Sequence, residues 1–84
     1  MREKKPIGAV VHFYGDLGVA IVKFSKVVAV GTRVKFKGAT TDFEEAIKSM
    51  QFEHKGIDKA KKGQEVGVKV GEKVREGDLI FEAE

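Results

Sequence analysis

Apolar residues recur at every second position in several short runs, which is the pattern of strands with one buried face. The clearest run is Arg33–Lys37, where Val34 and Phe36 alternate with three cations. Val66–Val70 alternates in the same way, Val19–Phe24 is a run with β-branched residues at positions 19, 21 and 22, and Leu79–Ala83 follows a turn as the closing strand. We therefore predict strands over these four segments, with Val34 and Phe36 in the core.

The N-terminal part predicts a hairpin. Ile7–Phe13 reads as a strand whose alternation places the side chains of four residues on one face: Ile7, Ala9, Val11 and Phe13. Tyr14–Gly18 supplies turn residues, and the Val19–Phe24 run follows directly. A loop of about four or five residues would join two antiparallel strands.

A short motif recurs three times, with an apolar residue three positions before a glycine and another three positions after it. Its glycines are Gly31, Gly63 and Gly77. Glycine relaxes the restriction on φ at a tight turn, after which the chain enters a strand. Short strands at close spacing, separated by glycine turns, are typical of a small closed barrel, and closure removes exposed sheet edges.

The segment from Thr40 to Phe52 fits two interpretations. Thr41–Glu44 resembles a helix capping box, and Phe43, Ile47 and Met50 have helical spacing. The alternative is a strand from about residue 46 to 53, with Ala46, Met50 and Phe52 on one side. Local rules alone favour the helix.

The order of these motifs resembles the second domain of translational GTPases such as elongation factor Tu. The matching segments, within residues 6–82, are Ile7–Val10, Gly31–Val34, Met50–Glu53, Ala60–Val70 and Val74–Ile80. This resemblance implies a Greek-key β-barrel. The phosphate-binding loop of those GTPases is missing, so GTP hydrolysis is excluded. Glu65 stands where that family has an asparagine in its aminoacyl-tRNA pocket.

The chain also resembles, more closely, the small C-terminal barrel of collagenase-like peptidases. This likeness rests on Thr40–Phe43, Ser49–Gln51 and Val66–Val70. It implies a strand over residues 46–53, and we adopt that strand because sheet pairing overrides local propensity. We predict an all-β fold: one closed Greek-key barrel of about six strands over residues 1–84, with residues 1–5 as a flexible tail.

Composition narrows the class of protein. The chain has 84 residues, no cysteine and 42% hydrophobic residues, which suffices for one small core. Without cysteine there is no disulfide framework or cysteine-based metal site. No apolar stretch approaches the length of a membrane span. We expect a cytoplasmic protein, and the dense Lys and Glu content suits a thermophile.

The formal charge of +3 conceals two basic segments. Lysine and arginine neutralise backbone phosphates, so these segments are candidates for weak nucleic-acid binding. The candidate residues are Arg33, Lys35, Lys37, Lys23, Lys55, Lys59, Lys61 and Lys62. The alternative is a solvated strand face whose lysines discourage edge pairing, and the modest net charge favours this second interpretation.

Catalytic and metal chemistry find little support. His12 and His54 are the only histidines, and a zinc site needs three or four ligands. Asp42, Glu44 and Glu45 lack the arrangement of an acid–base pair. We expect no metal, no cofactor and no catalytic residue. The six phenylalanines are most simply core, and Tyr14 at a turn is the aromatic residue most open to solvent.

Two main functions follow. The first is a stand-alone, non-catalytic translation-factor-like module that binds RNA, a ribonucleoprotein or a protein, with RNA binding that salt weakens. The second is a detached C-terminal-type accessory domain of a collagenase-like peptidase, which acts through protein–protein contact. A structural or oligomeric module without a ligand is a third option.

Overall fold

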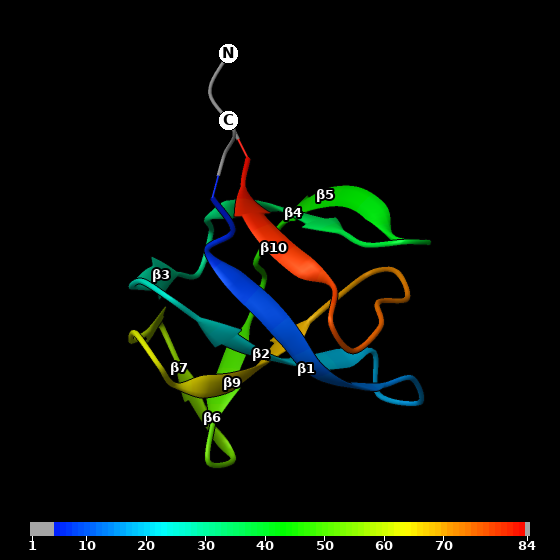
Figure 1. Ribbon diagram of the computed structural model, residues 1–84. Coiled ribbons are helices and arrows are strands. Elements are labelled where there is room, and N and C mark those ends of the chain that lie inside the picture. The colour runs from blue at the N-terminus through cyan, green and yellow to red at the C-terminus, as the bar shows by residue number, and fades with distance from the viewer. Residues whose placement is uncertain (1–4, 84) are drawn as a thin grey trace.

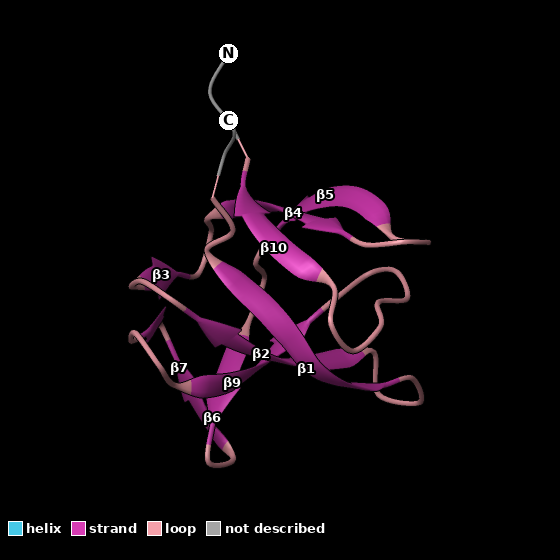
Figure 2. Ribbon diagram, viewed as in Figure 1, coloured by secondary structure: helices cyan, strands magenta, loops and turns pink. Residues whose placement is uncertain are grey.

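The fold is all-β. The structure is a computed structural model and describes residues 5–83. These residues form strands and loops without a helix (Figures 1 and 2). The strands are β1 (Gly8–Tyr14), β2 (Val19–Phe24), β3 (Val28–Ala29), β4 (Arg33–Lys37), β5 (Asp42–Ala46), β6 (Met50–Phe52), β7 (Lys55–Ile57), β8 (Lys59–Ala60), β9 (Glu65–Lys69) and β10 (Leu79–Glu82).

Eight strands make one curled antiparallel sheet in the order β5-β4-β10-β1-β2-β9-β6-β7. β3 and β8 pair separately as a small second sheet. The predicted number of about six strands is too low, because β3, β7 and β8 have only two or three residues and show no usable alternation. Closure into a barrel is not confirmed, since β5 and β7 are the outer strands of the sheet order. The predicted tail lies outside the described residues except for Lys5.

The core lies inside the curl of the sheet. Val34 and Phe36 are buried there as predicted, and Phe24 is buried with them. Phe13, Phe43 and Phe52 are half-buried against this core. Tyr14 is exposed as predicted. The strict alternation of β4 therefore identifies the inner face of the sheet correctly.

The predicted common face of the first strand is confirmed for Ile7 and Phe13, which lie in or against the core, and is wrong for Ala9 and Val11, which line the outer groove. A β-bulge is the reason. Val10 pairs with Val22 and His12 pairs with Ile21, so Val11 is an extra residue without a partner on β2. A bulge reverses the alternation of the residues on either side of it. Val10 is consequently buried, whereas Val11 is 41% exposed on the outer face.

The conflict over residues 40–53 resolves into two strands. β5 pairs with β4 along its whole length, and Phe43 stacks on Phe36 with ring centroids 5.0 Å apart. β6 pairs with both β7 and β9. The strand adopted for residues 46–53 is thus confirmed only at β6. The capping-box segment is strand as well, because pairing along β4 outweighs its helical pattern.

The recurrent glycine motif marks left-handed turns. Gly31, Gly63 and Gly77 have φ values of 94°, 83° and 91°. Other residues are strained in this conformation, so glycine is required at each turn. Gly77 also donates its N–H to the carbonyl oxygen of Val10 at 2.9 Å, which anchors the turn before β10 to the bulge of β1.

The β6–β7 turn holds two residues other than glycine in left-handed conformations. Glu53 and His54 have φ values of 51° and 67° and connect Phe52 directly to its partner Lys55. Asn-Gly suits such a two-residue turn best. We expect Glu53→Asn combined with His54→Gly to raise the free energy of unfolding by about 1 kcal/mol, measured by urea denaturation. Glu72→Asn is the control, and an unchanged or lower stability of the double variant would contradict this prediction.

Candidate functional site

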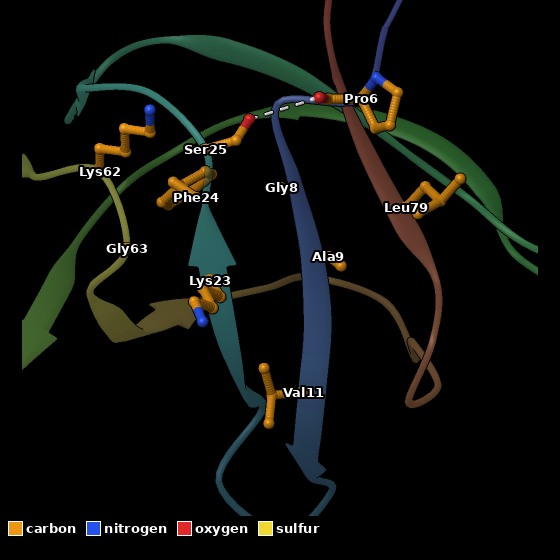
Figure 3. A pocket seen from close by; sticks show the side chains of 10 residues that line it. All are labelled: Pro6, Gly8, Ala9, Val11, Lys23, Phe24, Ser25, Lys62, Gly63 and Leu79. Carbon is orange, nitrogen blue, oxygen red and sulfur yellow. Dashed lines mark hydrogen bonds between the residues drawn. The ribbon is translucent and has the colours of Figure 1, made fainter.

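An apolar groove crosses the outer face of the sheet over β10, β1 and β2. Its centre is a cross-strand row in which Leu79 pairs with Ala9 and Ala9 pairs with Lys23. The groove has a volume of about 460 Å³ (Figure 3). Its lining residues are Pro6, Gly8, Ala9, Val11, Lys23, Phe24, Ser25, Lys62, Gly63 and Leu79. We call this feature the β1–β2–β10 groove.

The bulge and one glycine shape this groove. The bulge turns Val11 outward, and Leu79 is 39% exposed beside it. Gly8 leaves room for Phe24, because a Cβ atom at Gly8 would lie only 2.8 Å from Cδ1 of the Phe24 ring. The rim is held by the N–H of Ser25, which donates to the carbonyl oxygen of Ile7 at 2.8 Å. The apolar floor is therefore built into the sheet.

Among residues 5–83, two lysines are the only charged residues that line the groove. Lys23 projects from β2, and Lys62 belongs to the turn between β8 and β9 (Figure 3). Neither forms an ion pair within residues 5–83. Glu65 of β9 stands opposite Lys23 in the register, but no ion pair joins them. A groove with carbon walls and two ammonium groups outside ion pairs suits an apolar ligand that carries negative charge.

The basic strand β4 differs in this respect. Arg33 lies 3.9 Å from a carboxylate oxygen of Glu44, and Lys35 lies 3.5 Å from one of Asp42. Lys37 stands directly opposite Asp42 in the register of β4 and β5. The acids of β5 thus offset much of the charge that made β4 a candidate for phosphate binding.

The eight candidate cations do not lie together on one part of the fold. β4 lies next to one outer strand of the sheet, whereas Lys55 lies on β7, the opposite outer strand. Lys59 is on β8 in the small sheet, and Lys61 follows it. Lys23 and Lys62 are the pair that the fold brings to one groove. Nucleic-acid binding by these residues stays a prediction.

A second hollow lies beside the groove over β2, β9 and β6. Its volume is about 280 Å³, and its floor includes Gly67 together with Val19 and Ile21. The rim is mixed in character and contains Tyr14, Leu17, Gln51, Glu53, His54 and Glu65. Lys23 of the groove pairs with Glu65 of this hollow, so the two features adjoin.

In the part of the chain that the structure describes, neither histidine belongs to a group of side chains that could bind a metal ion. No three His, Cys, Asp or Glu side chains gather there as metal ligands. His12 Nδ1 instead lies 2.7 Å from an oxygen of Glu76, and its ring packs edge-on against Tyr14. Over the same residues, no helix is long and apolar enough to cross a bilayer.

Comparison with known proteins points to peptidases. No family model matches the chain. It is 43% identical over 79 residues to an uncharacterized protease of Methanocaldococcus jannaschii, a match that covers 93% of this chain and 19% of that protein. It is 29% identical over 82 residues to a collagenase of Porphyromonas gingivalis, covering 95% of this chain and 23% of the collagenase. The chain spans about a fifth of the length of these relatives.

Solved structures show the same fold. One is the C-terminal domain of a candidate U32 peptidase from Geobacillus thermoleovorans as its selenomethionine variant, with a TM-score of 0.88 and 22% identity. It covers 94% of this chain and all of that domain. A second structure of that domain has a TM-score of 0.87 and 20% identity, covering 100% of this chain and 99% of the domain. This chain shares the fold of that C-terminal domain.

These findings support the predicted resemblance to the C-terminal barrel of collagenase-like peptidases. The likeness to the second domain of elongation factor Tu stays a prediction. The sequence pattern names Lys23 and Lys62 but does not predict the groove. The bulge that exposes Val11 cannot be recognised from the alternation of apolar and polar residues along β1. The one available signal was Leu79, an apolar residue opposite the cationic β4 strand.

Proposed function

We propose that this chain serves as a C-terminal-type accessory domain of a collagenase-like peptidase and acts through protein contact, without catalysis of its own. The supporting observation is 43% identity to the M. jannaschii protease across 93% of this chain. The matched part is about a fifth of that protein, so four fifths remain to supply a catalytic part and a contact surface. The apolar groove is a surface that such a contact would cover.

A hybrid protease tests this function. In the hybrid, this chain replaces the 79 matched residues of the M. jannaschii protease. A bifunctional lysine reagent and mass spectrometry then identify cross-links between this chain and the rest of the hybrid. We expect cross-links from several strands, because a docked domain holds one face against its neighbour.

The control is this chain joined through the same connecting residues to an unrelated carrier protein. Tethering alone should give reproducible cross-links only near the junction, whereas cross-links elsewhere should vary between repeats. If the hybrid and the carrier fusion gave the same pattern, the chain would have no specific contact with the peptidase part, and the proposed function would be wrong.

RNA is the alternative partner predicted from the basic segments. A filter assay with the isolated chain and total RNA at low salt distinguishes the two functions. The ion pairs of Arg33 and Lys35 lead us to expect weak retention. Strong retention that is lost when Arg33, Lys35 and Lys37 are all replaced by glutamate would favour RNA over protein contact.

A further inference from the structure

We propose that the β1–β2–β10 groove is the docking site of this domain on the peptidase part, and that its occupant is an extended apolar segment of that part carrying carboxylates. This inference rests on the proposed function and specifies the surface and the chemistry of the partner. It follows from the position of the groove, from its charge and from the exposed side chains around it.

The position of the groove places it beside the entering chain. The Geobacillus domain is the C-terminal part of its protein, so the rest of that polypeptide precedes it and enters at its N-terminal end. In the shared fold this end corresponds to the start of β1, where Pro6 forms the rim of the groove (Figure 3). Segments that lie close to such an entry point meet the groove at a high effective concentration, so even a modest interface is occupied.

The chemistry of the groove selects its occupant. Val11 and Leu79 offer exposed apolar surface, which gains free energy when it is covered. Lys23 and Lys62 flank this surface and form no ion pair within residues 5–83, although Glu65 stands opposite Lys23 in the ladder. Carboxylates on the occupant would supply the missing partners, whereas a basic segment would be repelled.

The charge distribution argues against the other faces as the primary contact. On β4, Arg33 and Lys35 already have ion-pair partners on β5, so docking there would replace these two ion pairs. The second hollow has a mixed rim and a smaller volume, about 280 Å³ against about 460 Å³. Its exposed residue Leu17 provides a matched control for Leu79.

Lysine acetylation reports directly on the groove. An amine reagent is applied to the isolated chain and to the hybrid protease, and the rate at each lysine is measured by mass spectrometry. In the hybrid we expect Lys23 and Lys62 to react about tenfold more slowly, because an opposed carboxylate favours the unreactive ammonium form. Lys59 and Lys61, which do not line the groove, should react at the same rate in both proteins.

Two variants of the hybrid make this test specific, each checked for folding by circular dichroism. Leu79→Asn removes the exposed apolar side chain from the groove without adding charge and should restore the fast reaction of Lys23 and Lys62. Leu17→Asn makes the same change in the second hollow and should leave both lysines protected. Protection that only Leu17→Asn removes, or that neither variant removes, would overturn the groove as the docking site.

The outcomes separate this inference from the function on which it rests. If cross-linking shows contact but Lys23 and Lys62 react equally fast in both proteins, the docking site lies elsewhere and the accessory function stands. If neither cross-linking nor lysine protection appears in the hybrid, the accessory function itself fails.

Discussion

Replacing Phe36 by alanine is expected to cost about 4 kcal/mol of the free energy of unfolding, since the substitution empties the centre of a small core. Phe36 is 1% exposed, and its ring stacks on Phe43. β4 lies between β5 and β10, so a cavity there loosens both pairings. Because a domain of this size is only marginally stable, the thermal midpoint should fall by roughly 15–30 °C.

Two controls show whether the Phe36 effect comes from packing. Phe36→Leu keeps most of the apolar volume and should cost less than about 1.5 kcal/mol. Leu17→Ala removes an apolar side chain that is 63% exposed and should change stability by less than about 0.5 kcal/mol. Equal losses for Phe36→Ala and Leu17→Ala in urea denaturation would place the core elsewhere.

Replacing Asp78 by alanine is expected to cost about 3 kcal/mol, because this buried carboxylate ties two loops together. Asp78 is only 5% exposed to solvent. The Thr41 hydroxyl donates to Oδ2 at 2.5 Å, and the backbone N–H of Arg75 donates to the same oxygen at 2.8 Å. The loop between β4 and β5 is thereby fixed to the turn that precedes β10. Asp16→Ala, in the exposed β1–β2 loop, is the control.

Gly38 gives an independent check on this carboxylate. A methyl group at Gly38 would collide with Oδ1 of Asp78, so Gly38→Ala should also destabilise the fold. In the Asp78→Ala background the collision partner is gone, and the cost of Gly38→Ala should shrink markedly. Strictly additive effects in thermal unfolding would mean that the two residues do not interact.

The alternation of apolar residues predicts the longer strands well and fails where pairing depends on distant residues. β2 and β4 have the predicted bounds because each carries its own buried face. The face of β1 could not be predicted, since the bulge at Val11 is set by the pairing with β2. β5 was hidden behind a helix-like pattern that only the ladder with β4 overrides.

The candidate site was predictable only in its parts. The sequence identifies Lys23 and Lys62 as exposed cations, but not that the turn between β8 and β9 brings Lys62 next to β2. It identifies Arg33 and Lys35 equally well, yet the acids of β5 that pair with them are visible only once that strand is placed. A run of cations in the sequence is therefore a weaker guide to binding than the charges that face those cations from neighbouring strands.

An apolar groove beside the start of β1 offers a surface on which a second segment can dock. The groove adjoins Pro6, and no cluster of metal-ligating groups lies among the described residues. Docking through such a surface would hold a peptidase part in a fixed orientation to this domain. The absence of catalysis by this chain stays a prediction.

Amide hydrogen exchange tests the central claim, contact of this domain with the peptidase part through its outer face, most directly. Exchange is followed over residues 5–83 in the isolated chain and in the hybrid protease. We predict slower exchange in the hybrid for residues 7–11, 23–25, 62–63 and 79–82, with no change in β5 or β7. Identical exchange in the two proteins, or slowing confined to β5 or β7, would contradict the account.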